Sequence, residues 1–219
     1  MKLLVFDTET TGLPAGRNLS VTNVEKWPHI IQLSYILYDT EINKTCSCVD
    51  DIIKLADDVH ISSKSIEMHG ITRSTSIRKG ISMADALNNF NNVLQEADWV
   101  IAHNISFDKN MIMVESIRLG IEQHFSYGSG YGIKEYCTMR NSVKVCKIEK
   151  ESAAGNIYYK FPTLTELHSH LFNFTPNNTH DSMSDVLICL RCYYVLAHRE
   201  DVVTKGCGII RKLYNLYCT

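Results

Sequence analysis

Two carboxylates, Asp7 and Glu9, stand two residues apart near the start of the sequence, and residues 10–13 (Thr-Thr-Gly-Leu) follow them. On an extended strand, residues two apart point to the same side, so the pair presents two negative charges together. Such charges raise each other's pKa unless a cation lies between them, and hard oxygen ligands suit Mg²⁺ or Mn²⁺. A solvated strand end is the alternative interpretation of this segment alone.

A third carboxylate, Asp108, ends the segment His-Asn-Ile-Ser-Phe-Asp at residues 103–108. The segment follows an apolar run at residues 99–102 that predicts a buried strand, and ligands usually bind beyond the carboxyl ends of such strands. Asp108 also falls in the first turn of the next expected helix. An acid there complements the helix dipole, with Asn104 or Ser106 as the N-cap. This segment alone leaves both interpretations open.

The third segment, residues 180–185, reads His-Asp-Ser-Met-Ser-Asp and comes directly before a helical pattern. Histidine side chains titrate near neutral pH, so His180 on a loop is suited to proton transfer. A lone loop histidine, however, is usually an ordinary surface residue. Ser182 and Asp185 approximate a capping box, which would give Asp185 a structural role.

Hydrophobic periodicity predicts the elements that bring these three segments together. Apolar runs predict strands at residues 3–6, 30–38, 47–55 and 99–102, and helical spacing predicts helices at 82–97, 107–120, 163–172 and 182–198. Residues 14–28 and 125–132 are typical of loops, and residues 147–160 of an exposed insertion. The pattern favours an α/β fold: one domain with a mixed central sheet flanked by helices. Residues 1–200 form this expected domain, and residues 201–219 are a C-terminal extension of it.

The formal net charge of −2 argues against tight, non-specific coating of nucleic acid, because phosphate contacts require a basic face. Two divalent cations held by carboxylates would add four positive charges at one place. A pocket that grips one strand end is therefore compatible with this charge.

The first residues lack the apolar run of a secretory signal, and no apolar run reaches the ~18 residues of a membrane span. We therefore expect no membrane association and an intracellular protein, in the cytoplasm or alternatively the nucleus. The eight cysteines are then expected to be thiols. Cys189 and Cys192 have zinc-like spacing but lack a second pair, so we interpret them as two small residues on a helix.

Taken in order, the three segments resemble those of the DEDDh (DnaQ-like) 3′→5′ exonucleases, a family in the RNase H-like superfamily. Residues 68–72 (Met-His-Gly-Ile-Thr) are similar to the family's His-Gly-Ile-Thr motif. Residues 137–139 (Cys-Thr-Met) lie where a similar short motif precedes the last helices. The resemblance covers roughly residues 2–198, most of the chain.

The resemblance implies a single RNase H-like domain and a hydrolase that uses two Mg²⁺ or Mn²⁺ ions per active site. In the family's pattern, Asp7, Glu9 and Asp185 would hold one ion. Asp7 would also reach the second ion, assisted by Asp108, and His180 would be the general base for the attacking water. These five residues are the expected catalytic set.

The resemblance also implies how a nucleic acid 3′ end is held. The terminal nucleotide would contact residues of four segments: Thr10, Thr11, Gly12, Leu13, His69, Asn104 and Phe107. A core position for Phe107 and a loop-packing role for His69 are the alternatives. The expected reaction releases nucleoside 5′-monophosphates from a single strand, with DNA preferred over RNA. A polymerase or another replication or repair protein is the expected partner, and the oligomeric state stays open. A binding module that kept the fold is the alternative function.

Overall fold

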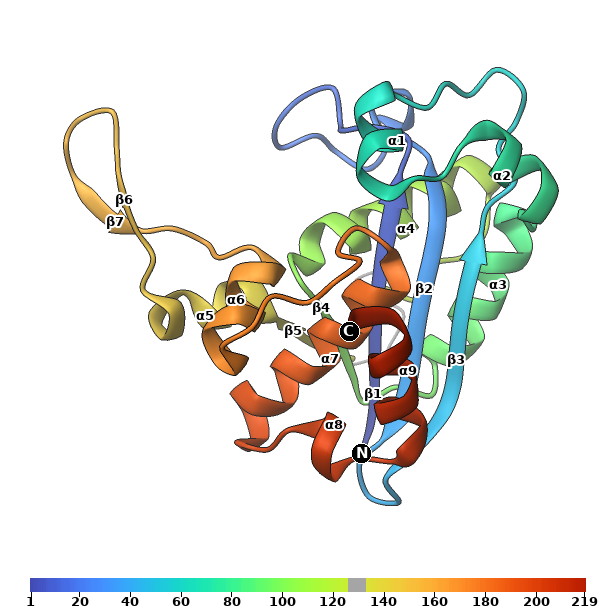
Figure 1. Cartoon of the computed structure of the whole chain (residues 1–219). Coiled ribbons are helices and arrows are strands. Elements are labelled where there is room, and N and C mark those ends of the chain that lie inside the picture. The colour runs from blue at the N-terminus through green and yellow to red at the C-terminus, as the bar shows by residue number, and fades with distance from the viewer. Residues whose placement is uncertain (126–132) are drawn as a thin grey trace.

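A five-stranded sheet runs through the computed structural model, which describes residues 1–125 and 133–219 (Figure 1). The strand order is β3-β2-β1-β4-β5. The strands are β1 (Lys2–Thr10), β2 (Ile30–Asp39), β3 (Lys44–Ile52), β4 (Trp99–Ala102) and β5 (Lys134–Cys137). β2 pairs antiparallel with β1 and β3, whereas β4 pairs parallel with β1 and β5. The sheet is therefore mixed, and the predicted fold class is confirmed.

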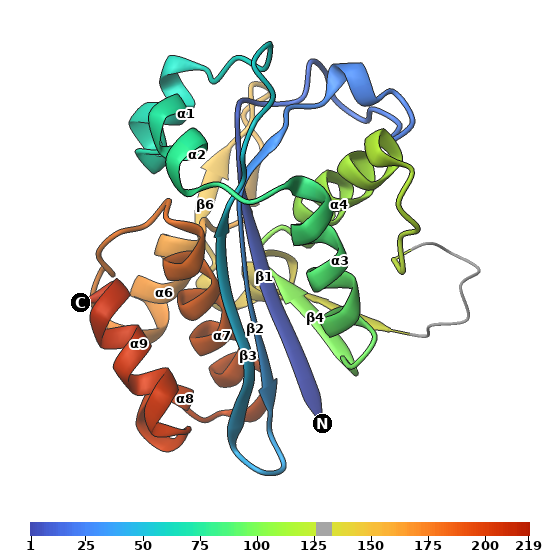
Figure 2. The same cartoon turned by 90° about the vertical axis from the view of Figure 1, so that its right-hand side faces the viewer.

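Helices cover both faces of this sheet (Figure 2). One face carries α3 (Met83–Leu94) and α4 (Ile105–Leu119). The other carries α5 (Thr138–Cys146), α6 (Leu164–Phe172), α7 (Ser182–His198), α8 (Val202–Lys205) and α9 (Gly208–Cys218). Two short helices, α1 (Ser63–His69) and α2 (Arg73–Lys79), lie at the end of the sheet where β1 finishes. A single 3-10 turn, η1 (Val24–Lys26), lies within the 14–28 loop.

Strand β1 lies in the middle of the sheet, and its side chains alternate between two cores. Residues 4 and 6 pack in the core with α3 and α4, and residues 3 and 5 pack in the core with α7. Because successive strand side chains point to opposite faces, Asp7 and Glu9 lie on the α7 side and Thr8 on the α4 side. The alternation thus decides which helix each polar residue can meet.

The long predicted helices are confirmed, with boundaries shifted by a few residues. β1 runs on through Thr10, so the first acidic segment lies inside the strand rather than after it. The short helix α1 escaped prediction, although its ends carry clear signals. Ser62 accepts a hydrogen bond from the amide of Ser65 at the start, and Gly70 adopts a φ of 70° at the end.

The predicted insertion at residues 147–160 forms a two-stranded antiparallel hairpin that projects from the body of the molecule (Figure 1). Its strands are β6 (Glu149–Glu151) and β7 (Ile157–Tyr159), and every residue in them is exposed, as expected for an insertion. Most of the other predicted loop, residues 126–132, lies outside the described residues.

The C-terminal extension forms α8 and α9, which pack on α7. Ile210, Tyr214 and Cys218 are the buried residues of α9, and they join the core formed with α7. Cys189 and Cys192 are also buried in that core as free thiols, which confirms their interpretation as helix residues. Within the described residues, no helix combines the length and apolar character needed to cross a membrane.

Candidate active site

Side chains from separate parts of the chain meet beside the end of β1. Ligand atoms of Glu9, His180 and Asp185 lie within 4.8 Å of one another. Asp7 lies close enough for its charge to raise the pKa of Glu9, Asp185 and Asp108. The structure therefore brings the five predicted catalytic residues into one acidic cluster, which we call the catalytic cluster after the role that the sequence predicts for it.

The start of α7 is tied to β1 and β2 by hydrogen bonds. Ser182 is fully buried and donates from Oγ to the backbone oxygen of Asp7 at 2.8 Å. Gln32 accepts from the Ser182 amide at 3.3 Å and donates to Asp181 at 3.2 Å. These contacts place the first turn of α7, and with it Asp185, next to the acidic residues of β1.

The predicted capping box of Ser182 and Asp185 is wrong. The N-cap is Asp181, whose carboxylate accepts from the Ser184 amide at 3.0 Å, and Ser182 is already the first helical residue. Asp181 is the N-cap in place of Ser182 because a carboxylate accepts a stronger hydrogen bond from a helix amide than a hydroxyl does. Asp185 is therefore not needed for capping, and its carboxylate is available to the cluster.

Asp108 lies in the first turn of α4, as predicted, and is 3% exposed. Its Oδ1 accepts from the amide of Thr8 at 3.1 Å and from the hydroxyl of Thr8 at 2.9 Å. Asn104 occupies the N-cap position with a φ of 68°, but neither it nor Ser106 caps the helix through a side chain. The carboxylate of Asp108 is thus directed to β1, because Thr8 points to the α4 side of that strand.

Burial and nearby negative charges raise the pKa values of all four carboxyl groups. Burial raises the pKa of Asp7 to about 7, against a hydrogen bond from Ser182 that lowers it. Burial, followed by the charges of Asp7 and Asp185, raises the pKa of Glu9 to about 9. Burial and the charge of Asp7 likewise raise the pKa values of Asp108 and Asp185. The cluster therefore resists carrying four negative charges by itself.

The residues after Glu9 form a turn fixed by their own hydroxyl groups. Thr10 Oγ1 donates to the oxygen of Gly12 at 2.8 Å, and Thr11 exchanges hydrogen bonds with the backbone of His29 at 2.9 Å. Leu13, at the end of the turn, is 79% exposed. The two threonine hydroxyls are engaged in holding the turn, whereas Leu13 presents apolar surface to solvent.

The other three predicted contact residues occupy different surroundings. His69 ends α1, accepts from the Ile71 amide at 3.0 Å through Nδ1, and lines the same cleft as His180. Asn104 begins α4 beside the cluster's Asp108. Phe107 is half-buried, packs against the α3–α4 core and also lines a groove with Trp27 and Arg140. The sequence left two alternatives for Phe107, a position in the core and a position in contact with a nucleotide. The side chain packs against the core and is also accessible from the groove.

A family model for exonucleases, RNase T, matches residues 4–193 of the sequence. The chain belongs to this exonuclease family. Its members are DEDD-type 3′→5′ exonucleases, DnaQ-like hydrolases of the RNase H-like superfamily, so the predicted resemblance is confirmed. The match spans all three acidic segments.

Solved structures of Exonuclease I share the fold of this exonuclease domain. The E. coli enzyme in complex with a dT13 oligonucleotide has a TM-score of 0.68 at 16% identity, over 90% of this chain and 41% of that chain. The zinc-bound form of the E. coli ExoI–ssDNA complex has a TM-score of 0.64 at 17% identity, over 98% of this chain and 42% of that chain. The chain thus spans less than half the length of these proteins. A search of curated proteins gave no match.

The catalytic cluster of the exonuclease domain has the chemistry of a divalent metal site. Its carboxylates supply hard oxygen ligands, and all four have pKa values raised by burial. Among the ion pairs of the described residues, none joins a lysine or arginine to these four groups. A cation would relieve their repulsion, so the residues present fit divalent metal ions.

The cleft beside His180 includes residues that the sequence did not reveal. Its volume is about 670 Å³, and its walls are the end of α1 (residues 67–70), the loop at 178–181, and Leu216 and Tyr217 of α9. The signal for α9 was present, because Ile210, Tyr214 and Cys218 recur at helical four-residue spacing. The C-terminal extension is therefore part of the cleft wall.

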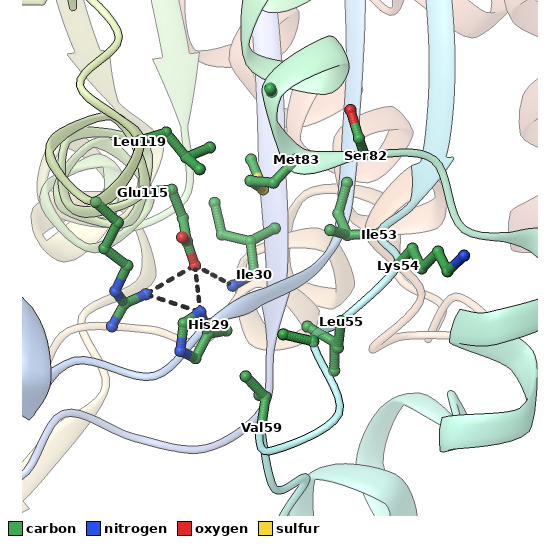
Figure 3. A pocket seen from close by; sticks show the side chains of 13 residues that line it. His29, Ile30, Ile53, Lys54, Leu55, Val59, Ser82, Met83, Glu115 and Leu119 are labelled. Atoms are coloured by element: carbon green, nitrogen blue, oxygen red, sulfur yellow. Dashed lines mark hydrogen bonds and ion pairs between the residues drawn. The ribbon is translucent and has the colours of Figure 1, made fainter.

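The exonuclease domain has a second polar cluster on the α3–α4 side, at a pocket of about 360 Å³ (Figure 3). Glu115 points toward His29 and Ile30, and accepts from the Ile30 amide at 3.1 Å and from Arg118 at 2.8 Å. Arg118 also donates to the backbone oxygens of Val24, Trp27 and Pro28 at 2.6–2.9 Å. We call this the Glu115–Arg118 clamp, because it fastens the 14–28 loop to α4.

Proposed function

We propose that this exonuclease domain hydrolyses the terminal phosphodiester bond at the 3′ end of single-stranded nucleic acid and releases nucleoside 5′-monophosphates. The observation that carries the proposal is the convergence of Glu9, His180 and Asp185 within 4.8 Å, with Asp7 beside them. These groups come from β1, a loop and α7, so their meeting is a property of the fold.

In this proposal Asp7, Glu9 and Asp185 would hold one Mg²⁺ or Mn²⁺ ion, and Asp7 and Asp108 would hold a second. When bound, two such ions stabilise the charge on the attacking and leaving oxygens of an in-line displacement at phosphorus. The hydrogen bonds from Thr8 hold Asp108, and the bond from Ser182 to the backbone of Asp7 holds the first turn of α7. These bonds hold Asp108, and the turn that carries Asp185, in place before a substrate arrives.

His180 is the general base in this mechanism. Its side chain is exposed on the loop before α7 and reaches the carboxylates of Glu9 and Asp185. It takes a proton from a water molecule whose oxygen forms a bond to the terminal phosphorus. The bond from that phosphorus to the 3′ oxygen of the preceding nucleotide breaks, and the 3′ oxygen gains a proton. A positioned base contributes ~10²–10⁴-fold to such a rate.

The turn after Glu9 receives the end of the strand. Leu13 supplies apolar surface, and the backbone at Gly12 is open, since a Cβ there would meet nothing within 4 Å. Contacts of this kind tolerate any base, because every base has an apolar face. We therefore propose little sequence preference at the terminal nucleotide.

DNA is the proposed substrate in preference to RNA. Support comes from the solved relatives, since Exonuclease I structures contain dT13 and dA16 oligonucleotides. Matched DNA and RNA oligonucleotides of one sequence, each single-stranded and duplex, test this preference. Faster release from single-stranded DNA is the expected result, and faster release from RNA would reverse the assignment.

The activity itself is tested with oligonucleotides labelled at either end, in the presence of Mg²⁺ or EDTA. Mononucleotides should appear from the 3′ label at once in Mg²⁺, whereas the 5′ label should shorten progressively. EDTA should stop both. Release of the 5′ label first, or long internal fragments, would contradict the proposal.

A further inference from the structure

The end of helix α9 is joined to the loop that carries His180, residues 173–181, which we call the base loop. Three hydrogen bonds of 2.7–3.0 Å link the two: the Asn177 amide to the Cys218 oxygen, Asn177 Nδ2 to the Thr219 oxygen, and Asn178 Nδ2 to the Tyr217 oxygen. The last carbonyls of a helix have no partner within the helix. Here, the base loop supplies those partners.

The same end of α9 touches the first turn of α7. Ser184 Oγ, which donates to the Asp181 carboxylate at 3.0 Å, lies 3.4 Å from the oxygen of Tyr217, and the thiol of Cys218 donates to the oxygen of Ser184 at 3.8 Å. Ser184 precedes Asp185, whose carboxylate belongs to the catalytic cluster. One helix end therefore contacts both segments that deliver catalytic side chains from this part of the chain.

The backbone of the base loop needs such support. Asn178 has a φ of 52° and His180 a φ of 76°, both in the left-handed region that non-glycine residues seldom occupy. Conformations of this kind persist when the surrounding structure holds them in place. The side-chain bond from Asn178 to α9 lies two residues before His180, so it acts on the strained part of the loop.

Helix α9 is itself firmly seated. Tyr214 is buried, its hydroxyl lies 2.5 Å from Nε2 of His168 in α6, and the guanidinium of Arg191 in α7 lies 4.7 Å from its ring centre. The helix is therefore a rigid support, whereas the base loop depends on it.

We propose that α9 positions the general base: its terminal carbonyls hold the base loop so that the His180 ring faces the attacking water. Asn177 and Asn178 both join the loop to α9 through their side chains, and Asn178 is the main positioning residue because it lies nearer to His180. This inference rests on the proposed function of His180 as a base. It assigns a role in catalysis to the C-terminal extension, which contributes none of the metal ligands.

The test compares two asparagines of the base loop that both have positive φ. Asn178→Gly removes the bond to Tyr217 and leaves the backbone free to keep its conformation. Asn173→Gly is the matched control, since Asn173 has a φ of 60° and ends α6. We expect Asn178→Gly to lower kcat about tenfold with little change in KM, because small misplacements of catalytic groups cost up to ~10²-fold. Asn173→Gly should stay within about twofold of wild type.

A double-mutant cycle with His180→Ala shows whether Asn178 acts through the base. In the His180→Ala background, Asn178→Gly should cost nothing further. Equal losses in both backgrounds, or equal kcat values for Asn178→Gly and Asn173→Gly, would overturn the inference. If His180→Ala leaves kcat unchanged, the proposed function of His180 has failed instead.

A second pair of variants covers the case in which the glycine substitution unfolds the loop region. Asn178→Asp keeps the size of the side chain but replaces the donor with an acceptor, and Asn173→Asp matches its change of charge. A lower kcat for Asn178→Asp alone, with melting temperature and Mn²⁺ affinity unchanged, supports the positioning role. If Asn178→Asp lowered Mn²⁺ affinity together with kcat, the effect would lie in the metal site and the positioning role would be contradicted.

Discussion

The catalytic cluster at the end of β1 and the Glu115–Arg118 clamp are two polar clusters of one domain, and buried carboxylates have opposite kinds of neighbours in them. Glu115 receives an amide hydrogen bond and a guanidinium, and His29 lies 3.2 Å from the same oxygen. In the catalytic cluster, Glu9 and Asp185 face other carboxylates, whose charges raise their pKa values.

The difference separates a structural role from a catalytic one. A buried carboxylate that is fully paired holds backbone in place, as Glu115 and Arg118 hold the 14–28 loop. Buried carboxylates that face one another carry a free-energy cost that only a cation or protons can relieve. Breaking the clamp should therefore lower the free energy of unfolding and leave activity nearly unchanged. Neutralising the catalytic cluster should lower activity and leave the fold intact.

The largest expected effect is the loss of activity on neutralising the catalytic cluster. Asp7→Asn or Asp185→Asn should lower kcat by about 10²–10³-fold, the loss that follows removal of one group that stabilises charge in a transition state. The fold should persist, because these side chains repel one another in the wild type. Nucleotide release measured beside circular dichroism checks both parts, and Asp58→Asn, at an exposed site, is the control. If either cluster variant kept activity within tenfold of wild type, the distinction between the catalytic cluster and the clamp would be wrong.

The second effect is the loss of stability on breaking the clamp. Glu115→Gln leaves the Arg118 guanidinium without its buried partner, and removal of one member of such a pair costs about 3–5 kcal/mol. Urea unfolding measures this loss, with the exposed Glu122→Gln as the control. Activity per folded molecule should remain within a few-fold of wild type. If Glu115→Gln left the free energy of unfolding unchanged, the clamp would not contribute to stability.

The third effect is a dependence of stability on pH that metal ions remove. The folded-state pKa values of Asp7 and Glu9, about 7 and about 9, exceed the 3.8 and 4.5 of free carboxyl groups. The folded state therefore binds more protons, so metal-free protein loses stability as pH rises from 5.5 to 8.5. At ~1.4 kcal/mol per pKa unit, Asp7 should contribute about 2 kcal/mol and Glu9 about 4 kcal/mol to this loss, of the order of 6 kcal/mol together.

Melting temperatures in EDTA and in Mg²⁺ at both pH values measure this dependence. The decrease in EDTA should shrink in Mg²⁺, and Asp7→Asn should reduce it in the absence of metal. A metal-free protein that becomes more stable as the pH rises over this range would contradict the description of the cluster.

The smallest expected effect concerns the strand end. Leu13→Ala should raise KM about three- to tenfold, the equivalent of ~1 kcal/mol of lost apolar contact, and leave melting unchanged because Leu13 is exposed. Ile42→Ala, also exposed but in the turn between β2 and β3, is the matched control. Steady-state kinetics on a short single strand measure both. Equal KM values for the two variants would remove Leu13 from the binding surface.

The sequence predicted the residues of the catalytic cluster, but not the clamp or the α9 contacts. The cluster residues lie on strand and helix positions that can be recognised from neighbouring residues alone. The two-residue spacing of Asp7 and Glu9 was enough to place both on one face of β1. The first turn of α4 was equally predictable for Asp108. The family resemblance then supplied the long-range meeting of these segments, which periodicity alone does not determine.

The clamp and the α9 contacts escaped prediction because they join residues far apart in sequence. Ile30 and Glu115 are 85 residues apart, and Asn178 and Tyr217 are 39 apart. A glutamate and an arginine at i, i+3 on a helix also look like an ordinary surface pair. The fold shows that Glu115 is buried and that Arg118, half-buried, is bonded to the backbone of the 14–28 loop. The wrong capping box had a local cause, since Asp181 stands next to Ser182 and is the better acceptor.

Manganese binding tests the central claim most directly. Crystals grown with Mn²⁺ should show anomalous density about 2.1 Å from carboxylate oxygens of Asp7, Glu9 and Asp185, and a second peak reached by Asp7 and Asp108. Density at these carboxylates is the predicted result. A protein that releases nucleotides in Mn²⁺ while its anomalous peaks lie elsewhere would contradict the account.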